Sequence, residues 1–395
     1  MAPTYLFAVL VSLASCASNA PVEETLPFGE ERWRPYSFGE LSIWPTVDTT
    51  DALNAEAIAC LRRFCLHKLD TPRANDFWLT ADLERFGGIH GELFAAEFDS
   101  VGEPRYPPTL LAINHTGNPD ERLLTVRWAE EDSSGIAQRV RYVFDFLAIR
   151  TREGVRLSFP LDHLTRDWER IEMGPVTYIV SPGRTFSVEQ AQQQVKDVER
   201  LARFFEMPAV PITFYSCTDP TELFRIRGYQ QHPLMHVFPT GGRAEGKDLV
   251  FSGNNKEIYT HEVVHLFTGQ KFQERPWVLD EGLATLLAGS SEQPYTWHRT
   301  NLKAYLASGA QPDLERDLTS YEPTYINEHT NLAYVIGGAF CEHILRTRGK
   351  EGLFAVLASG EADVFNALAG LGLTRENMRQ ELVKELALEP YTLPW

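Results

Sequence analysis

Residues 260–285 read THEVVHLFTGQKFQERPWVLDEGLAT and contain the pattern that decides the fold of the second half of the chain. On a helix, side chains four positions apart lie on the same face, so His261 and His265 can bind one metal ion. Glu262 follows the first histidine and would stand beside that ion, where a general base for an attacking water belongs. The spacing predicts one Zn²⁺ site. Glu257, one helical turn earlier, is expected to be a solvated carboxylate at the helix start.

A second motif supplies the third ligand that an open tetrahedral zinc site requires. Residues 277–285, WVLDEGLAT, place Glu281 on a second helix. A HExxH helix followed by a W-x-x-x-E-G-x-A helix resembles the gluzincin metallopeptidases of the peptidase MA clan, the group of thermolysin and aminopeptidase N. The resemblance implies that Glu281 is the third zinc ligand and that Gly282 and Ala284 let the two helices approach. Asp280 would be a hydrogen-bonding partner of a ligating histidine.

The resemblance covers residues ~185 to ~395. Within it, Tyr334-Val335-Ile336-Gly337 is similar to the Y-x-K-G segment of the aminopeptidase N group, without its lysine. This implies that the Tyr334 hydroxyl donates to the oxyanion of the tetrahedral intermediate. The alternative is a core tyrosine, because the apolar residues Ala339 and Ile344 follow at helical spacing. His298 is the spare candidate for the oxyanion role.

The sequence departs from both named enzymes in two places. The segment between the two motifs, residues 266–280, is shorter, and no GAMEN-like exopeptidase motif precedes the HExxH helix. Residues 241–246, GGRAEG, and the strand-like residues 249–252 stand in its place and look like the edge strand that pairs with an extended peptide. We therefore expect an endopeptidase that acts on a peptide or protein substrate.

The first half of the chain predicts a separate α+β domain. Two helical patterns precede strands bounded by Gly, Pro, Asn or Asp, an order that resembles the NTF2-like or cystatin cone fold. The predicted helices span 51–69 and 79–86, and the strands span 109–115, 123–130, 138–150, 154–160 and 175–182. A helix at 186–205 then opens a mostly α-helical, thermolysin-like domain with strands at 211–218, 235–239 and 248–252. The predicted division is an accessory domain at 46–184 and a peptidase MA-like zinc domain at 185–395.

Residues 1–16 read as a lipoprotein signal peptide and residues 17–45 as a tether. The apolar run Leu6–Val11 is too short to span a membrane, and Leu13-Ala14-Ser15-Cys16 after it resembles the bacterial lipobox. The resemblance implies export and a membrane anchor by a lipid on Cys16, in the outer membrane of a Gram-negative bacterium, on its periplasmic or surface face. The alternatives are an ordinary signal cut near Ala20 and a short buried helix.

Composition limits the partners and the redox chemistry of this chain. Its 395 residues carry a net charge of −17, and a field of that sign repels phosphate backbones, so we expect no nucleic-acid partner. Apart from Cys16, the cysteines show neither zinc spacing nor a disulfide framework, and buried free thiols are expected. They are Cys60, Cys65, Cys217 and Cys341.

Two functions remain open from the sequence. The first is a zinc endopeptidase, and the alternative is a non-catalytic peptide- or partner-binding surface lipoprotein on a metallopeptidase fold. The complete HExxH–E set favours the first, because a purely structural zinc site has no use for Glu262. The helix-plus-sheet first domain favours the second, because such folds often bind ligands or partners.

Overall fold

All the predicted strands except the one at 235–239 lie in two separate sheets. The structure is a computed structural model that describes residues 40–393 except 71–73, 87–92, 94, 100 and 132–136. These residues divide into an N-terminal unit, 40–168 with 218–239, and a C-terminal unit, 169–217 with 240–393. The mixture of helices and two sheets agrees with the α+β prediction at its coarsest level. The predicted signal peptide, Cys16 and most of the tether lie outside the described residues.

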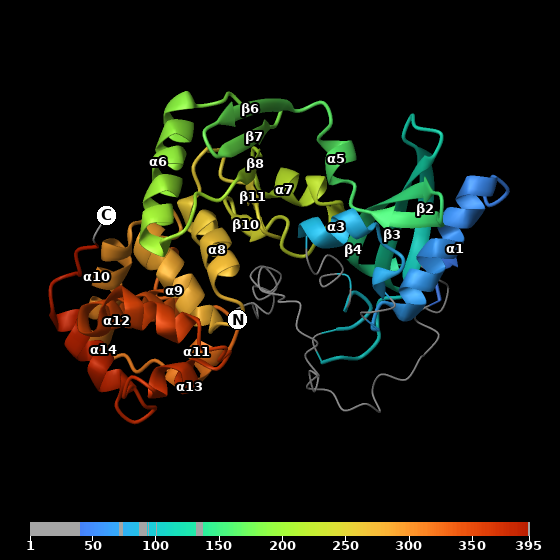
Figure 1. Cartoon of the computed structure of the whole chain (residues 1–395). Helices are drawn as coiled ribbons and strands as arrows, with labels where there is room; N and C mark the ends of the chain where they lie inside the picture. The colour runs from blue at the N-terminus through green and yellow to red at the C-terminus, as the bar shows by residue number, and fades with distance from the viewer. Residues whose placement is uncertain are drawn as a thin grey trace. The chain divides into compact units, whose positions relative to one another are not determined.

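The N-terminal unit is built on an antiparallel meander of four strands, with a short strand added at two places (Figure 1). The four are β2 (Pro108–His115), β3 (Glu121–Glu131), β4 (Ala137–Thr151) and β5 (Gly154–Ser158). The additions are β1 (Ser42–Ile43), parallel to β2, and β9 (Tyr229–Gln231), antiparallel to β4. Alternation along β4 buries Phe144 and Phe146 on one face of the sheet.

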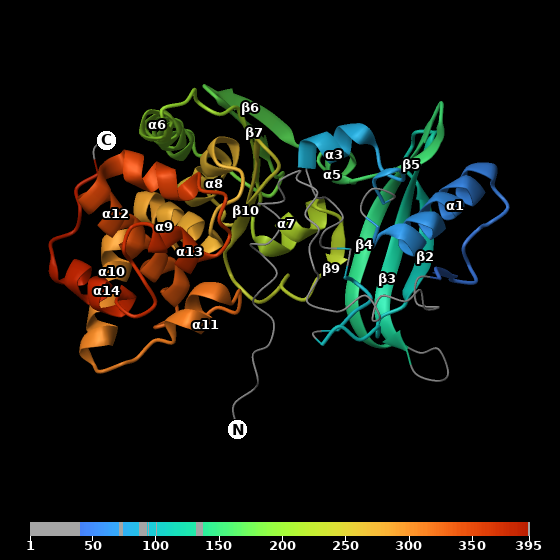
Figure 2. The same ribbon diagram turned by 60° about the horizontal axis from the view of Figure 1, so that its bottom comes forward.

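This unit also contains helices. They are α1 (Ala52–His67), α3 (Thr80–Phe86), α5 (Leu161–Leu164) and α7 (Pro220–Ile226). Asp51 caps α1, because its side chain accepts the Asn54 N–H at 2.9 Å. The apolar face of α1 packs against β3, β4 and β5 (Figure 2). There the rings of Phe64 and Trp78 meet edge to face with centroids 5.5 Å apart, and both side chains are buried.

Residues 218–239 belong to the N-terminal unit although strands of the C-terminal unit precede and follow them. Gln230 Nε2 donates to Asp145 Oδ2 at 2.7 Å, which fastens β9 to β4. The predicted strand at 235–239 is wrong. The Met235 N–H donates to the His232 carbonyl at 3.1 Å, so the chain turns there instead of extending.

The C-terminal unit begins with a five-stranded sheet in the order β10-β11-β8-β7-β6. Its strands are β6 (Glu169–Met173), β7 (Val176–Val180), β8 (Ile212–Ser216), β10 (Gly242–Glu245) and β11 (Leu249–Ser252). The helix α6 (Val188–Phe205) connects β7 to the parallel strand β8 (Figure 1). The predicted domain boundary after residue 184 therefore falls inside this unit, between β7 and α6. It leaves out β6 and β7, which the sheet requires.

Helices make up the rest of the C-terminal unit. They are α8 (Thr260–Lys271), α9 (Trp277–Ala288), α10 (Tyr295–Ala307), α11 (Leu314–Thr319), α12 (Leu332–Leu357), α13 (Val364–Ala369) and α14 (Met378–Ala387). The helix α12 is broken at Gly349, where φ is +67°. A continuous apolar core joins the helices to the sheet. In the part of the chain that the structure describes, no helix combines the length and apolar character needed to cross a membrane.

Glycines bring α9 and α12 into backbone contact. A Cβ on Gly282 would lie 2.2 Å from the backbone carbon of Gly337, and a Cβ on Gly337 would lie 2.1 Å from the Val278 carbonyl oxygen. From the sequence, Gly282 was expected to let α9 approach the HExxH helix. The structure shows that it serves the crossing with α12 instead. Because α9 and α12 cross here, Tyr334, which lies one turn before Gly337 on α12, is close to Glu281 on α9.

Gly282→Ala is expected to destabilise the C-terminal unit by about 1–3 kcal/mol or more, because a methyl group would have to separate two backbones. Equilibrium unfolding in urea measures the loss. Gly370→Ala is the matched control. Gly370 has helical φ and ψ, and no atom lies within 4 Å of its added Cβ, so this change should leave stability unchanged or slightly raised. A Gly282→Ala variant as stable as the parent would show that the crossing tolerates a side chain.

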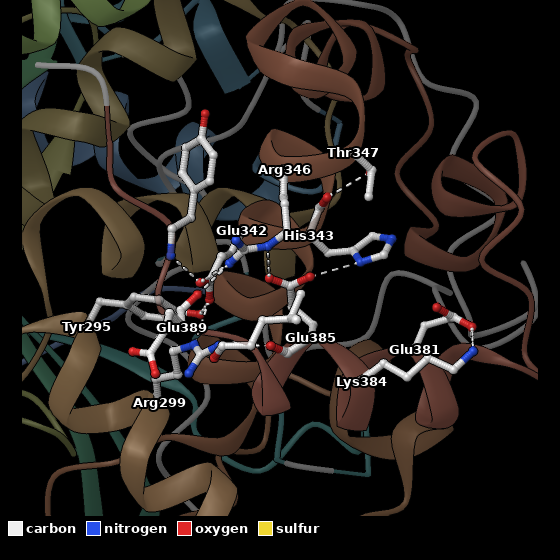
Figure 3. Close-up of polar contacts among 12 residues, drawn as sticks. Tyr295, Arg299, Glu342, His343, Arg346, Thr347, Glu381, Lys384, Glu385 and Glu389 are labelled. Atoms are coloured by element: carbon white, nitrogen blue, oxygen red, sulfur yellow. Dashed lines mark hydrogen bonds and ion pairs between the residues drawn. The ribbon is translucent and has the colours of Figure 1, made fainter.

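A buried carboxylate on α12 joins this helix to α10 and to the chain after α14 (Figure 3). Glu342 Oε2 accepts the Tyr295 hydroxyl at 2.6 Å and Arg299 Nε at 2.8 Å. Its Oε1 accepts a guanidinium N–H of Arg346 at 3.1 Å and the Tyr391 N–H at 2.6 Å. All four of these donors bind the fully buried Glu342 side chain. This shared acceptor fixes the position of α12 relative to α10 and to the chain after α14.

Candidate metal centre

The first residues of α8 form hydrogen bonds with polar side chains of α6. Gln194 and Asp197, close together on one face of α6, point at the residues that open α8. Gln194 Oε1 accepts the Tyr259 N–H at 2.7 Å, and Asp197 Oδ2 accepts the Thr260 hydroxyl at 2.8 Å. Side chains of α6 therefore satisfy groups at the start of α8, where Tyr259 provides no side-chain cap of its own. The following turn then presents its two histidines in a fixed orientation.

Three side chains from α8 and α9 converge. The Nε2 atoms of His261 and His265 lie 3.2 and 3.5 Å from Glu281 Oε2, and candidate ligand atoms of all three residues lie within 4.8 Å of one another. Tetrahedral ligands at ~2.0–2.1 Å from a zinc ion stand ~3.3–3.4 Å apart. The three side chains are buried. The triad therefore has the size of one tetrahedral metal site.

The outer nitrogen of each histidine is already engaged. His261 Nδ1 lies 2.7 Å from the Gly289 carbonyl oxygen, which can only accept, so Nδ1 carries the proton. His265 Nδ1 lies 3.2 Å from Asp280 Oδ2, and Arg275 donates to the same oxygen at 2.8 Å. In the neutral rings both Nε2 atoms then present lone pairs towards the Glu281 carboxylate. Lone pairs that face one another in this way repel. A divalent cation between them would bind all three as ligands, so the arrangement fits such an ion.

The charges of the site agree with this assignment. Although burial opposes it, the positive charge of His265 in its protonated form lowers the pKa of Glu281 to about 2. Burial likewise acts to lower the pKa of His265, but the charges of Asp280 and Glu281 raise it well above its ordinary value. The surroundings therefore favour positive charge at the triad, which a divalent cation can supply in place of a proton.

Glu262 stands beside the triad and is held by the edge strand. The Ala244 N–H on β10 donates to Glu262 Oε2 at 2.8 Å. Gly253 N–H donates to the Gly241 carbonyl at 2.8 Å, so in the antiparallel pair of β10 and β11 the backbone groups of Gly242 and Ala244 point away from β11. They point to the side on which Glu262 lies. In the described part of this unit, β10 is the edge of the sheet on that side.

Tyr334 lies against the triad. Its ring stacks on His261 with centroids 6.1 Å apart and an interplanar angle of 20°. Burial, followed by the charge of Glu281, raises the pKa of Tyr334 well above the ordinary value. The phenol therefore keeps its proton as a donor at the site. The structure brings Tyr334 together with the three candidate ligands and Glu262.

Two other candidate residues, Glu257 and His298, are buried and bonded to residues outside the triad. Glu257 is fully buried, not solvated as predicted, because its carboxylate pairs with Arg184 and accepts the Ser216 hydroxyl at 3.0 Å. His298 is also buried. Its Nδ1 lies 3.0 Å from the Thr330 hydroxyl and its Nε2 lies 2.9 Å from the Ser290 carbonyl oxygen, so both ring nitrogens are engaged in contacts between segments. Neither residue has a free group to offer the triad.

Sequence reasoning missed several residues of the centre. Ala244 and Gly289 act through backbone atoms, which leave no signal in the side chains. Tyr259 and Arg275 sit next to the motifs, and their proximity in the chain was the only available signal. The buried cysteines 60, 65, 217 and 341 are free thiols, as expected, and none of them belongs to the centre.

Asp280→Asn is expected to weaken zinc binding about 10- to 100-fold, because the amide no longer supplies a charged acceptor for the His265 N–H. Competition titration against a chromophoric chelator measures the affinity. Asp313→Asn is the control. It changes a helix N-cap, where asparagine caps as well as aspartate, so zinc affinity should stay unchanged. An unchanged affinity in Asp280→Asn would remove Asp280 from the centre.

The sequence was compared with models of known protein families and with curated proteins. No family model matches the sequence, and no curated protein matches it.

Proposed function

We propose that this protein is a zinc-dependent peptidase of the gluzincin type, with His261, His265 and Glu281 as the metal ligands. One observation carries the proposal. Glu262 is not needed to hold the metal, yet the Ala244 N–H of an open strand edge fixes it beside the triad. A structural metal site gives no reason for that arrangement. A hydrolytic site requires a carboxylate at this place to accept a proton from water.

Zn²⁺, when bound, would polarise the scissile carbonyl and lower the pKa of water towards ~7. Glu262 accepts the proton of the attacking water and transfers it to the amine nitrogen as the peptide C–N bond breaks. The Tyr334 hydroxyl donates a hydrogen bond to the carbonyl oxygen as negative charge develops there. The products are one peptide with a new carboxylate and one with a new amine.

The substrate would bind as an extended strand along β10. The Ala244 N–H is already donated to Glu262, which leaves the Ala244 carbonyl and both backbone groups of Gly242 for the peptide. A strand edge can accept a chain that continues in both directions, so we favour an endopeptidase.

The same proposal includes export and a lipid on Cys16, which would place this activity at the outer membrane of a Gram-negative bacterium.

Cleavage of a diverse peptide library, read by mass spectrometry, tests this function. Protein without residues 1–20 is compared with its Glu262→Gln variant, both loaded with zinc. Cuts that only the parent makes would establish the peptidase, and the residues around each cut would describe its subsites. Zinc bound to both proteins with no cut by either would favour a protein that binds peptides or partners without cleaving them.

A further inference from the structure

The N-terminal unit contains a cavity of about 650 Å³ between α1, α3 and the hairpin that joins β4 to β5 (Figure 2). This volume falls in the range of roughly 300–1,000 Å³ that small-molecule sites occupy. It also equals the volume of about twenty water molecules in the liquid, which is more than a single amino acid needs. Every residue that lines the cavity belongs to this unit, so the unit has room for a small molecule of its own.

Backbone hydrogen bonds fix one wall of the cavity to β5. The Leu157 N–H donates to the Phe77 carbonyl at 2.7 Å, and the Leu79 N–H donates to the Leu157 carbonyl at 2.9 Å. The Phe77 ring lines the cavity and stacks on the His67 ring, with centroids 6.1 Å apart and an interplanar angle of 11°. This wall is therefore already formed before any ligand binds, as is usual for small-molecule sites.

Two arginines line the cavity, and most of their N–H groups remain available. Arg63 Nε donates to the Ala59 carbonyl at 3.3 Å, and its guanidinium lies 5.7 Å from the centre of the Phe77 ring. One terminal nitrogen of Arg156 donates to the Val155 carbonyl at 3.3 Å. Among the residues that the structure describes, no carboxylate accepts a hydrogen bond from either guanidinium. Because an arginine carries five N–H donors, each can still bind an anionic group.

Two carboxylates line the same cavity. Glu153 is exposed, and its Oε2 lies 3.7 Å from a guanidinium nitrogen of Arg156, which is too far for a hydrogen bond. Asp76 is also exposed and forms no ion pair within the described part of the chain. The lining thus carries charges of both signs in equal number. A ligand with one sign of charge would face two like charges, whereas a ligand with both signs complements all four.

We propose that this cavity binds a short peptide whose two ends are free, with its carboxylate on the two arginines and its ammonium group near Asp76 and Glu153. The planar guanidinium groups match the geometry of a carboxylate, which orients the ligand. The Phe77 ring offers apolar contact to a side chain of the peptide. The products of the proposed peptidase belong to this class of ligand, and only this link rests on the proposed function.

Isothermal titration calorimetry with trialanine tests the site. The zinc-loaded full chain carries Glu262→Gln throughout, so that no peptide is cut. We expect a Kd of about 1 mM or below. Arg63→Gln and Arg156→Gln should each weaken binding about 10-fold or more, because each removes a charged donor. Arg62→Gln is the matched control. It changes an exposed arginine of α1 outside the lining and should leave the affinity unchanged.

Capped peptides assign the two ends of the ligand. N-acetyl-trialanine lacks the ammonium group and trialanine amide lacks the carboxylate, so each should bind about 10-fold more weakly than trialanine. Asp76→Asn should weaken the binding of trialanine and leave that of N-acetyl-trialanine unchanged.

Several results would overturn the proposal. They are no binding of trialanine at millimolar concentration, equal binding by the two arginine variants and their background, and equal affinity for trialanine, alanine, N-acetyl-trialanine or inorganic phosphate. Because the titration involves no cleavage, it decides the ligand of this cavity even if the proposed function fails.

Discussion

Glu262→Gln should lower kcat/KM for peptide cleavage by about 10²–10⁴-fold, the range that a general base contributes. The amide has nearly the shape of the carboxylate, and its oxygen can still accept the Ala244 N–H, so the fold should be preserved. It cannot accept a proton from water. One zinc ion per chain should remain bound, because Glu262 lies outside the ligand triad.

Two matched variants make this result specific. Glu274→Gln changes an exposed glutamate between α8 and α9 and should retain both activity and zinc. His265→Ala removes a ligand and should lose zinc together with activity. Metal content is measured by elemental analysis and turnover by mass spectrometry of a cleaved peptide. Loss of zinc in Glu262→Gln would show that Glu262 is a ligand, and full activity would assign the base to another group.

Glu342→Gln should cost about 3–5 kcal/mol of stability, the range found when one partner of a buried ion pair is removed. Glu342 accepts from Tyr295, Arg299, Arg346 and the Tyr391 N–H (Figure 3). An amide has one oxygen, and its NH₂ group would face donors. The buried Arg299 guanidinium would then lose its countercharge, and Arg346 would keep only its pair with Glu385.

The same region offers the control. Glu381 and Lys384 form an exposed pair at 2.7 Å on α14, also drawn in Figure 3. Glu381→Gln should cost at most about 1 kcal/mol, because water and salt weaken an exposed pair. Urea unfolding with zinc present measures both variants. Similar small losses in the two would mean that the α10–α12–α14 cluster contributes no more than a surface contact.

The candidate ligands on α8 could be predicted because their information is local. The spacing of His261 and His265 fixes two ligands on one helix face whatever the rest of the fold does. Glu281 required the resemblance, and the structure brings it to the same point. The prediction for Glu257 failed because a residue at a helix start is exposed by default, and only the packing of Arg184 and Ser216 around it reverses that.

Features of the fold that depend on pairing between distant strands leave no local pattern in the sequence. The N–H of Ala244 reaches Glu262 only because β10 is an edge strand, and a strand order cannot be read from alternation within one strand. The same holds for residues 218–239. Their composition does not differ from that of their neighbours, and the assignment to the N-terminal unit depends on pairing of β9 with β4.

The late position of residues 218–239 in the chain affects how the N-terminal unit folds during synthesis on the ribosome. The N-terminal unit cannot complete its sheet when residue 168 emerges, because β9 follows β6, β7, α6 and β8 in the chain. Domains generally fold as units during translation, the N-terminal one first. Here the first unit must wait with the β4 edge uncovered at Val143 and Phe144, the residues that β9 later pairs. An unpaired strand edge of this kind promotes aggregation, so the nascent chain is most vulnerable between the emergence of β4 and that of β9.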